Sequence, residues 1–167
     1  MFTTVKQFEQ EWNRESGTTQ RLLDALTDES LSQEVAPGFR TLGAIAWHIV
    51  TQIHQTLKQT GLVFPSPGDD DDIPRTAAEI ADAYRRTSQA LLVAVRTQWT
   101  DASLGETRQV FGQSWTIGQT LRIFLTHEVH HRGQMTVLMR QAGLRVPDVY
   151  GPAKETWAEM GVPAPKL

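Results

Sequence analysis

The residues with the most chemistry to offer lie in segment 126–135, which reads THEVHHRGQM. His127, Glu128 and His131 match the H-E-x-x-H pattern, in which two histidines bind zinc and the glutamate serves as the general base of a metalloprotease. Because residues i and i+4 project from the same side of a helix, His127 and His131 can bind the same metal ion. The segment therefore raises two hypotheses, a metal site and a protease.

The protease hypothesis is weakened by what surrounds the motif. In the extended pattern H-E-x-x-H-x-x-G-x-x-H the glycine here, Gly133, comes one residue early, and Val137 stands where the third histidine belongs. Glu155 or Glu159 is available as a substitute ligand. However, proteases commonly align a peptide against a strand edge, and this chain has little strand signal. We therefore keep the histidine pair as candidate metal ligands and set the protease aside.

A pair of histidines is half of a metal site, so a third ligand must come from elsewhere. Imidazole suits zinc, nickel, copper and iron, and a catalytic zinc site typically has three protein ligands and one open position. His48 is the best third candidate, because it lies beside the apolar stripe of its helix and so points partly inward. His54 faces elsewhere, and His130 lies about 60° from His127 around the helix. Two alternatives stay open: an inward histidine that is a hydrogen-bonded core residue, and an exposed pair that is solvated.

The composition limits the classes of function. The chain has 167 residues, 40% apolar and 21% charged, with a formal net charge of −3 and no basic run, so we expect one domain over residues 1–167 and no nucleic-acid partner. It has no cysteine, which excludes disulfides, thiolate zinc sites and a cysteine nucleophile. No apolar run approaches the roughly 20 residues that span a membrane, and residues 1–12 lack the apolar run of a signal peptide. We therefore expect a cytoplasmic protein with no membrane partner.

The elements that must position the histidines are helices. Apolar residues recur at spacings of three and four along most of the chain. Thr41 is an N-cap residue at the start of the helix that carries His48, and Thr116 with Gln119 forms a capping-box pattern before the helix that carries the motif. These patterns predict an all-α four-helix bundle with a short C-terminal helix. The predicted helices cover residues 4–26, 41–60, 76–99, 117–142 and 153–160.

The connections are predicted from proline, glycine and charge. Segment 62–74, LVFPSPGDDDDIP, contains three prolines, one glycine and the four aspartates Asp69–Asp72. We predict a long surface loop there, able to cross an end of the bundle, and we interpret the aspartates as solvated. Segment 107–115 fits a small hairpin around Gly112, and segment 27–35 fits a short helical turn.

Three segments together resemble a known family. They are AIAWHIV around His48, HEVHHRGQM, and AGLRVPDVYGP, and their most specific part is H-x-x-x-H-R-G-Q followed by G-x-x-x-P-x-x-Y. In order and length the chain resembles the DinB/YfiT-like family of bacterial metal-binding four-helix bundles. The resemblance implies a site for a divalent metal, nickel or zinc, with His48, His127 and His131 as ligands. It also implies a homodimer and a cytoplasmic location, and it demotes Glu128, which is not part of the family pattern.

The same resemblance implies a class of chemistry. Some relatives look like thiol transferases, in which the metal activates a low-molecular-weight thiol such as bacillithiol or mycothiol. Others look like mycothiol-dependent isomerases or metal-dependent hydrolases. We expect thiol transfer to a small electrophilic substrate, because the sequence shows no clear general base and the reactive sulfur would arrive with the cosubstrate. The alternatives are a hydrolase that uses metal-bound water and a non-catalytic metal-binding or stress-response module.

Helical position also predicts residues that support the site. Gln134 lies three residues beyond His131, and Gln52 lies one turn beyond His48, so either amide can orient an imidazole or a bound water. Arg132 can hold a carboxylate, on the protein or on a thiol cosubstrate. For Gly133 we predict close helix packing rather than chemistry. A solvent-facing or inter-helix role remains the alternative for both glutamines.

Overall fold

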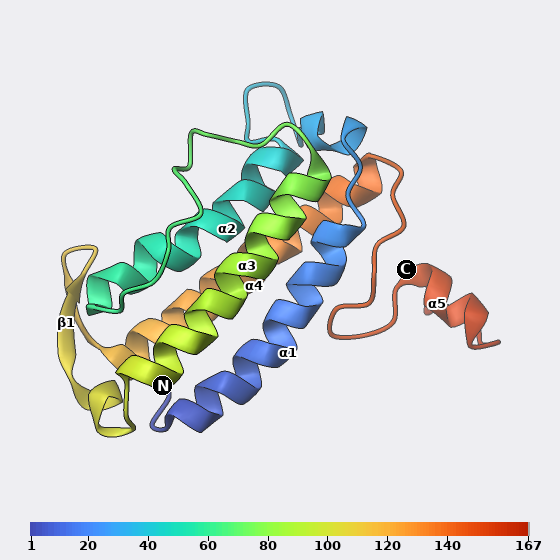
Figure 1. The fold of residues 1–167 in the computed structure, drawn as a ribbon. Helices are drawn as coiled ribbons and strands as arrows, with labels where there is room; N and C mark the ends of the chain where they lie inside the picture. The colour runs from blue at the N-terminus through green and yellow to red at the C-terminus, as the bar shows by residue number, and fades with distance from the viewer. Residues whose placement is uncertain (167) are drawn as a thin grey trace.

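The computed structural model describes residues 1–166, in which four long helices form a bundle and a short fifth helix follows them (Figure 1). The predicted all-α bundle is confirmed, and the helix ends fall within a few residues of those expected from the sequence. Within the described chain, no helix is long and apolar enough to cross a membrane. The helices are α1 (Val5–Asp24), α2 (Leu42–Leu57), α3 (Ala77–Gln98), α4 (Ile117–Gln141) and α5 (Lys154–Glu159).

Each long helix begins directly after a threonine. The threonine hydroxyl accepts a hydrogen bond from the backbone N–H three residues later, which satisfies one of the amides that a helix start leaves unpaired. At the starts of α3 and α4, the side chains of Glu79 and Gln119 also accept a hydrogen bond from the backbone N–H of the cap threonine, which completes a capping box. The four caps are Thr4, Thr41, Thr76 and Thr116.

Short elements connect the long helices. A 3₁₀ turn, Glu29–Ser32, precedes α2, and a second, Lys58–Thr60, extends α2 to Gly61, whose φ of +89° ends the helix. A third turn, Ala102–Gly105, leads into an antiparallel hairpin. Its turn residues Phe111 and Gly112 both have positive φ, at 50° and 74°, as a two-residue hairpin turn requires. The hairpin consists of β1 (Thr107–Val110) and β2 (Gln113–Thr116).

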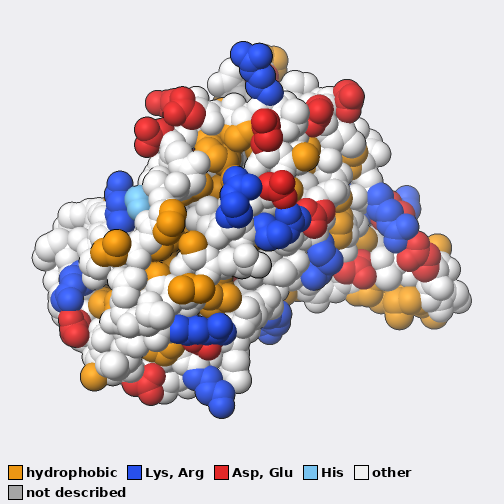
Figure 2. Space-filling view, in the orientation of Figure 1, with side chains coloured by type: hydrophobic (Ala, Val, Ile, Leu, Met, Phe, Trp, Pro, Cys, Tyr) orange, Lys and Arg blue, Asp and Glu red, His pale blue; other side chains and the backbone are white. Residues whose placement is uncertain are grey.

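The connection between α2 and α3 differs from the prediction. It does not cross an end of the bundle but runs back along the length of α2, because α2 and α3 point in the same direction (Figure 1). Gln98, the last residue of α3, bonds both backbone groups of Val63, which follows the end of α2. This return path carries the four aspartates past the middle of α2. On the visible face, acidic and basic groups are interspersed, and acidic groups gather near this connection (Figure 2).

The core lies between the four helices, with α2 packed against α3 and α4, and α1 against the same two helices. Trp12 is fully buried at its centre, with its ring 5.1 Å from that of Phe124, centroid to centroid. At the start of α4 the backbone approaches the N-terminus so closely that a Cβ on Gly118 would lie 2.1 Å from the carbonyl oxygen of Phe2. Only glycine fits there, and this contact fixes the lower end of α4 against the N-terminus.

Candidate metal centre

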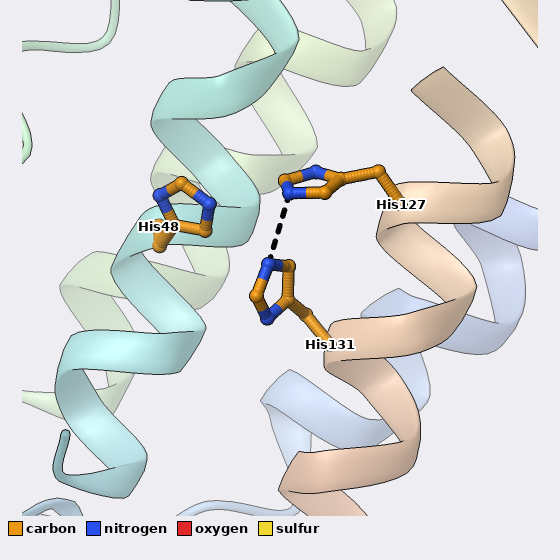
Figure 3. Close-up of side chains that lie close together, drawn as sticks. All are labelled: His48, His127 and His131. Carbon is orange, nitrogen blue, oxygen red and sulfur yellow. Dashed lines mark hydrogen bonds between the residues drawn. The ribbon is translucent and has the colours of Figure 1, made fainter. Parts of the chain in front are cut away.

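His48, His127 and His131 converge in the space between α2 and α4 (Figure 3). The ring of His48 lies 5.3 Å from that of His127 and 4.8 Å from that of His131, and the pair on α4 is 4.4 Å apart, all between centroids. One nitrogen from each ring lies within 4.8 Å of the other two. Three histidines from two helices are therefore within reach of one metal ion.

The Nδ1 atom of His48 contacts Asp70, which lies in the connection between α2 and α3. Nδ1 of His48 lies 3.1 Å from Oδ2 of Asp70, whose other oxygen accepts a hydrogen bond from the hydroxyl of Thr51. Although burial raises it, these two hydrogen bonds hold the pKa of Asp70 below its ordinary value. Since an ionised carboxylate only accepts, His48 donates from Nδ1 and its Nε2 keeps the lone pair that a metal needs.

The loop is fixed by a second contact beside the first. The indole nitrogen of Trp47 donates a hydrogen bond of 2.7 Å to the backbone oxygen of Asp69. The interpretation of the four aspartates as a solvated run was therefore wrong for Asp70, whereas the side chain of Asp69 is exposed and only its backbone oxygen is bonded. The sequence held one signal, a run of carboxylates next to a candidate ligand helix, but a loop of this length gives no periodicity from which its path can be predicted.

His131 is oriented from its own helix. Its Nδ1 lies 2.7 Å from Oε1 of Gln134, and the amide nitrogen of Gln134 lies 3.2 Å from Nε2 of His130. The amide oxygen can only accept, so His131 donates from Nδ1 and presents Nε2 to the site. Nε2 of His131 is 3.0 Å from Nε2 of His127. Gln134 thus makes the histidine contact that its helical position predicted.

The histidines on α4 are suited to bind a cation in neutral form. Burial, then the positive charges of the other histidines and of Arg40, lowers the pKa of His127 to about 4. Burial and the same kinds of charge also lower the pKa of His131, despite an opposing hydrogen bond from Gln134. Neutral imidazole is the form that ligates a metal, so little proton competition remains at neutral pH.

The arrangement fits a divalent metal on its donor chemistry and its spacing. Two nitrogens that each lie about 2.0–2.1 Å from one zinc ion are separated by about 2.9–3.4 Å at ordinary bond angles. The 3.0 Å between the Nε2 atoms of His127 and His131 falls in that range. Two of the three rings also have their outer nitrogens hydrogen-bonded, by Asp70 and Gln134, as metal-bound histidines commonly do. Among the described residues, no fourth His, Asp or Glu joins this group.

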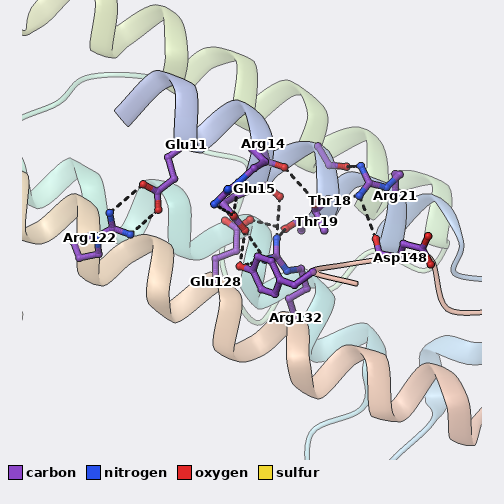
Figure 4. Close-up of polar contacts among 12 residues, drawn as sticks. Glu11, Arg14, Glu15, Thr18, Thr19, Arg21, Arg122, Glu128, Arg132 and Asp148 are labelled. Carbon is purple, nitrogen blue, oxygen red and sulfur yellow. Dashed lines mark hydrogen bonds and ion pairs between the residues drawn. The ribbon is translucent and has the colours of Figure 1, made fainter. Parts of the chain in front are cut away.

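Glu128 and Arg132, next to these ligands in sequence, point from α4 toward α1 (Figure 4). Glu128 is fully buried, and its Oε1 accepts hydrogen bonds of 2.7 Å from Thr19 of α1 and from Tyr84 of α3. Burial raises the pKa of Glu128 to about 7, even though hydrogen bonds from Thr19 and Tyr84 lower it. Glu128 is therefore a core carboxyl group that joins three helices, which rules out its role as base for the histidine site.

Arg132 meets a carboxylate of the protein rather than a histidine. Its guanidinium, 1% exposed, bonds Oε2 of Glu15 at 2.5 Å and the hydroxyl of Tyr150 at 2.6 Å. Tyr150 in turn donates to Glu15 at 2.8 Å, so the segment after α4 is tied to α1. Of the two carboxylates predicted for Arg132, the structure shows the one on the protein. No contact links Arg132 to the three histidines, because one step along a helix turns a side chain by about 100°.

Three further residues can be compared with their predictions. Gln52 is buried, and neither amide atom makes a hydrogen bond within residues 1–166, so no contact supports a role in orienting His48. Gly133 is exposed and a Cβ there would meet nothing within 4 Å, so the packing role predicted for it is wrong. His54 faces away from the site, as expected, and packs against Phe64 with 5.2 Å between ring centroids.

The fold and the histidines define a class, an all-α bundle with a three-histidine group that can hold a metal ion. A model of the DinB family matches residues 1–166, and the chain belongs to that family. It is 49% identical, over the full length of both chains, to the uncharacterized protein YrdA of Bacillus subtilis strain 168.

Solved structures agree with this assignment. A DinB-like protein from Bacillus cereus ATCC 10987 is 49% identical, with a TM-score of 0.88 over 90% of this chain and 100% of that one. The DinB-like protein YjoA of Bacillus subtilis, at 17% identity, has a TM-score of 0.67 over 88% of this chain and 99% of that one. The second likeness shows that the bundle is retained where the sequence has diverged widely.

Proposed function

We propose that this chain is a metal-dependent enzyme that transfers a low-molecular-weight thiol to a small electrophilic substrate. The observation that carries the proposal is the set of three converging histidines with no fourth His, Asp or Glu beside them among the described residues. A structural metal site is usually closed by four protein ligands, whereas a catalytic one keeps a position for a substrate. His48, His127 and His131 would hold nickel or zinc, and Asp70 and Gln134 would keep their rings in place.

The proposed reaction uses the three metal-binding histidines and a thiol that the cosubstrate supplies. His48, His127 and His131 would hold a divalent metal, which would supply a lowered pKa to a coordinated thiol and so make the thiolate available at neutral pH. The thiolate sulfur then forms a bond to an electrophilic carbon, the leaving group departs with its electron pair, and the thiol proton passes to solvent. The chain has no cysteine, so the sulfur belongs to the cosubstrate.

Thiol transfer is favoured over hydrolysis by the placement of the carboxylates. A hydrolase usually needs a positioned base beside its water. Glu128 is buried and bonded to Thr19 and Tyr84, and Asp70 is occupied by His48 and Thr51. We also propose a homodimer in the cytoplasm, the compartment in which small thiols are kept reduced.

Metal content and thiol consumption test this proposal. Purified wild-type protein should contain about one nickel or zinc ion per chain, and His127→Ala should lose it, because two histidines make an incomplete site. His54→Ala is the matched control, since His54 lies on the same helix as His48 but packs on Phe64, and it should keep its metal. Bacillithiol and mycothiol are then tested with 1-chloro-2,4-dinitrobenzene.

The outcomes separate the proposed functions. Metal-dependent loss of free thiol in wild type, absent from His127→Ala, supports thiol transfer. Metal-dependent cleavage of esters with no thiol consumption would instead make the protein a hydrolase. Stoichiometric metal retained in His127→Ala would refute the site itself.

A further inference from the structure

A pocket of about 420 Å³ adjoins the histidine site. His131 and Gln134 line it and also belong to the site, so a molecule in the pocket lies beside a metal ligand. This volume is in the range that small-molecule sites occupy, which runs from roughly 300 to 1,000 Å³. The other lining residues are Val35, Phe39, Arg40, Ile45, Val137 and Leu138.

The lining is apolar where it meets solvent. Val35 is 58% exposed, Phe39 66% and Val137 54%, and all three surround the same hollow. Single exposed apolar side chains are ordinary, but several around a hollow indicate a binding surface. An apolar group of a ligand can therefore pack against this lining.

One wall of the pocket is a loop whose two ends are hydrogen-bonded to each other. The loop between the first 3₁₀ turn and α2 is closed at its base by a bridge between Glu34 and Thr41 and by a 2.8 Å bond from the N–H of Leu42 to the oxygen of Gln33. At its tip Gly38 has a φ of +82°, and this turn places Phe39 beside the pocket. The wall is therefore held in position from both of its ends.

Arg40 is the one charged residue among those that line the pocket. Within residues 1–166 its guanidinium makes no ion pair and no side-chain hydrogen bond. It lines the same pocket as His131, one of the three histidines of the candidate metal site. An exposed cation without a protein partner, on the lining of an apolar pocket that also includes His131, suits an anionic group on a ligand.

We propose that this pocket binds a small organic anion with an apolar body, whose carboxylate pairs with Arg40 and whose body packs on Phe39 and Leu138. The inference rests on the proposed function, because it names the substrate class of the same site. The carboxylate fixes the molecule at one end, so that its electrophilic carbon faces the metal rather than solvent. The mixed lining of one cation and five apolar side chains fits such a ligand better than a polar sugar or a peptide.

The test uses 4-phenylbutyrate and its neutral counterpart 4-phenyl-1-butanol as probes, titrated by calorimetry into metal-loaded and metal-free protein. Arg40→Gln should weaken phenylbutyrate binding about tenfold or more, as loss of a charge-assisted hydrogen bond does, and should leave phenylbutanol within about twofold. Phe39→Ser should weaken both probes. Arg86→Gln, which removes an exposed arginine of α3, should change neither.

Equal binding of both probes to wild type, or no effect of Arg40→Gln, would overturn the assignment. So would a dimer, seen by sedimentation, that Phe39→Ser dissociates and that excludes both probes, because a second copy would then cover the pocket. Failure of the protein to hold metal would sink the proposed function. Loss of the Arg40 effect in a protein that does hold metal would sink the pocket assignment alone.

Discussion

Within α4, His127 and His131 face α2, whereas Glu128 and Arg132, each one residue further along, face α1 and α3. On the first side, two of the three converging histidines are bonded at their outer nitrogens, and the inner nitrogens face one another. On the second side, the charged groups are bonded to protein partners and excluded from water. The difference teaches that one i,i+4 pattern, repeated at a one-residue offset, can serve ligand binding on one face and helix assembly on the other.

The largest effect is expected on the buried side. Arg132→Met removes the buried cation beside the carboxylate of Glu15, 3% exposed, and leaves it only the exposed Arg14 and the hydroxyl of Tyr150, so it should lower the free energy of unfolding by about 3 kcal/mol. Urea denaturation measures this loss, with Arg86→Met as the exposed control. The folded fraction should keep its metal, because the histidines lie on the other face. Loss of metal without loss of stability would contradict the division between the faces.

Glu128 makes the buried side dependent on pH. Its pKa of about 7 lies above the value of 4.5 expected in the unfolded chain, so the folded state holds a proton that the unfolded state releases between these values. The contribution to stability is full below about pH 4.5 and is lost as pH rises through 7. Glu128→Gln, which imitates the protonated form, should therefore gain roughly 2–3 kcal/mol relative to wild type between pH 5 and pH 8. If the free energies of unfolding of the two proteins changed with pH in parallel, the pKa of Glu128 would be the same in the folded and unfolded chains. That result would contradict the prediction.

On the histidine side, Asp70 should matter most among the supporting residues. Asp70→Ala removes the acceptor that holds Nδ1 of His48, and such partners typically change metal affinity by about 10- to 100-fold. Competition with a chelator measures the affinity. Asp71→Ala is the neighbouring control, since Asp71 is exposed, and it should behave as wild type. Similar metal affinities of the two variants would show that Asp70 does not support the site and that the loop is only a solvated connection.

The smallest effect is expected at Gln134. Gln134→Ala removes a neutral hydrogen bond at an exposed position, so metal affinity should fall by about 2- to 10-fold, less than for Asp70→Ala. Gln141→Ala removes an exposed glutamine from the same helix and should have no effect. A larger loss of metal affinity in Gln134→Ala than in Asp70→Ala would contradict this order. It would show that metal binding depends more on the contact that holds His131 than on the one that holds His48.

Local patterns were enough to predict most of the fold. The threonine caps and the apolar spacing set the start and the length of each helix, and Gly112 marked a hairpin turn. The i,i+4 spacing of His127 and His131 was equally local, and the structure brings His48 to them.

The contacts that the sequence did not reveal are those made across long separations. Asp70 reaches His48 because α2 and α3 run in the same direction, which forces the loop to return along α2. A carboxylate partner was predicted for Arg132, but Glu15 could not be identified as that partner, because it lies 117 residues away and no spacing rule connects the two. Helical periodicity gives a side chain an angle around its own helix but does not say which neighbouring helix lies in that direction.

Anomalous diffraction from crystals of the nickel- or zinc-loaded protein tests the central claim, that two helices together build one metal site. The account predicts a single strong anomalous peak between α2 and α4, bonded by Nε2 of His48, His127 and His131 and by no other side chain. A peak bonded by the α4 pair without His48, a fourth protein ligand, or no peak at all at this position would contradict it.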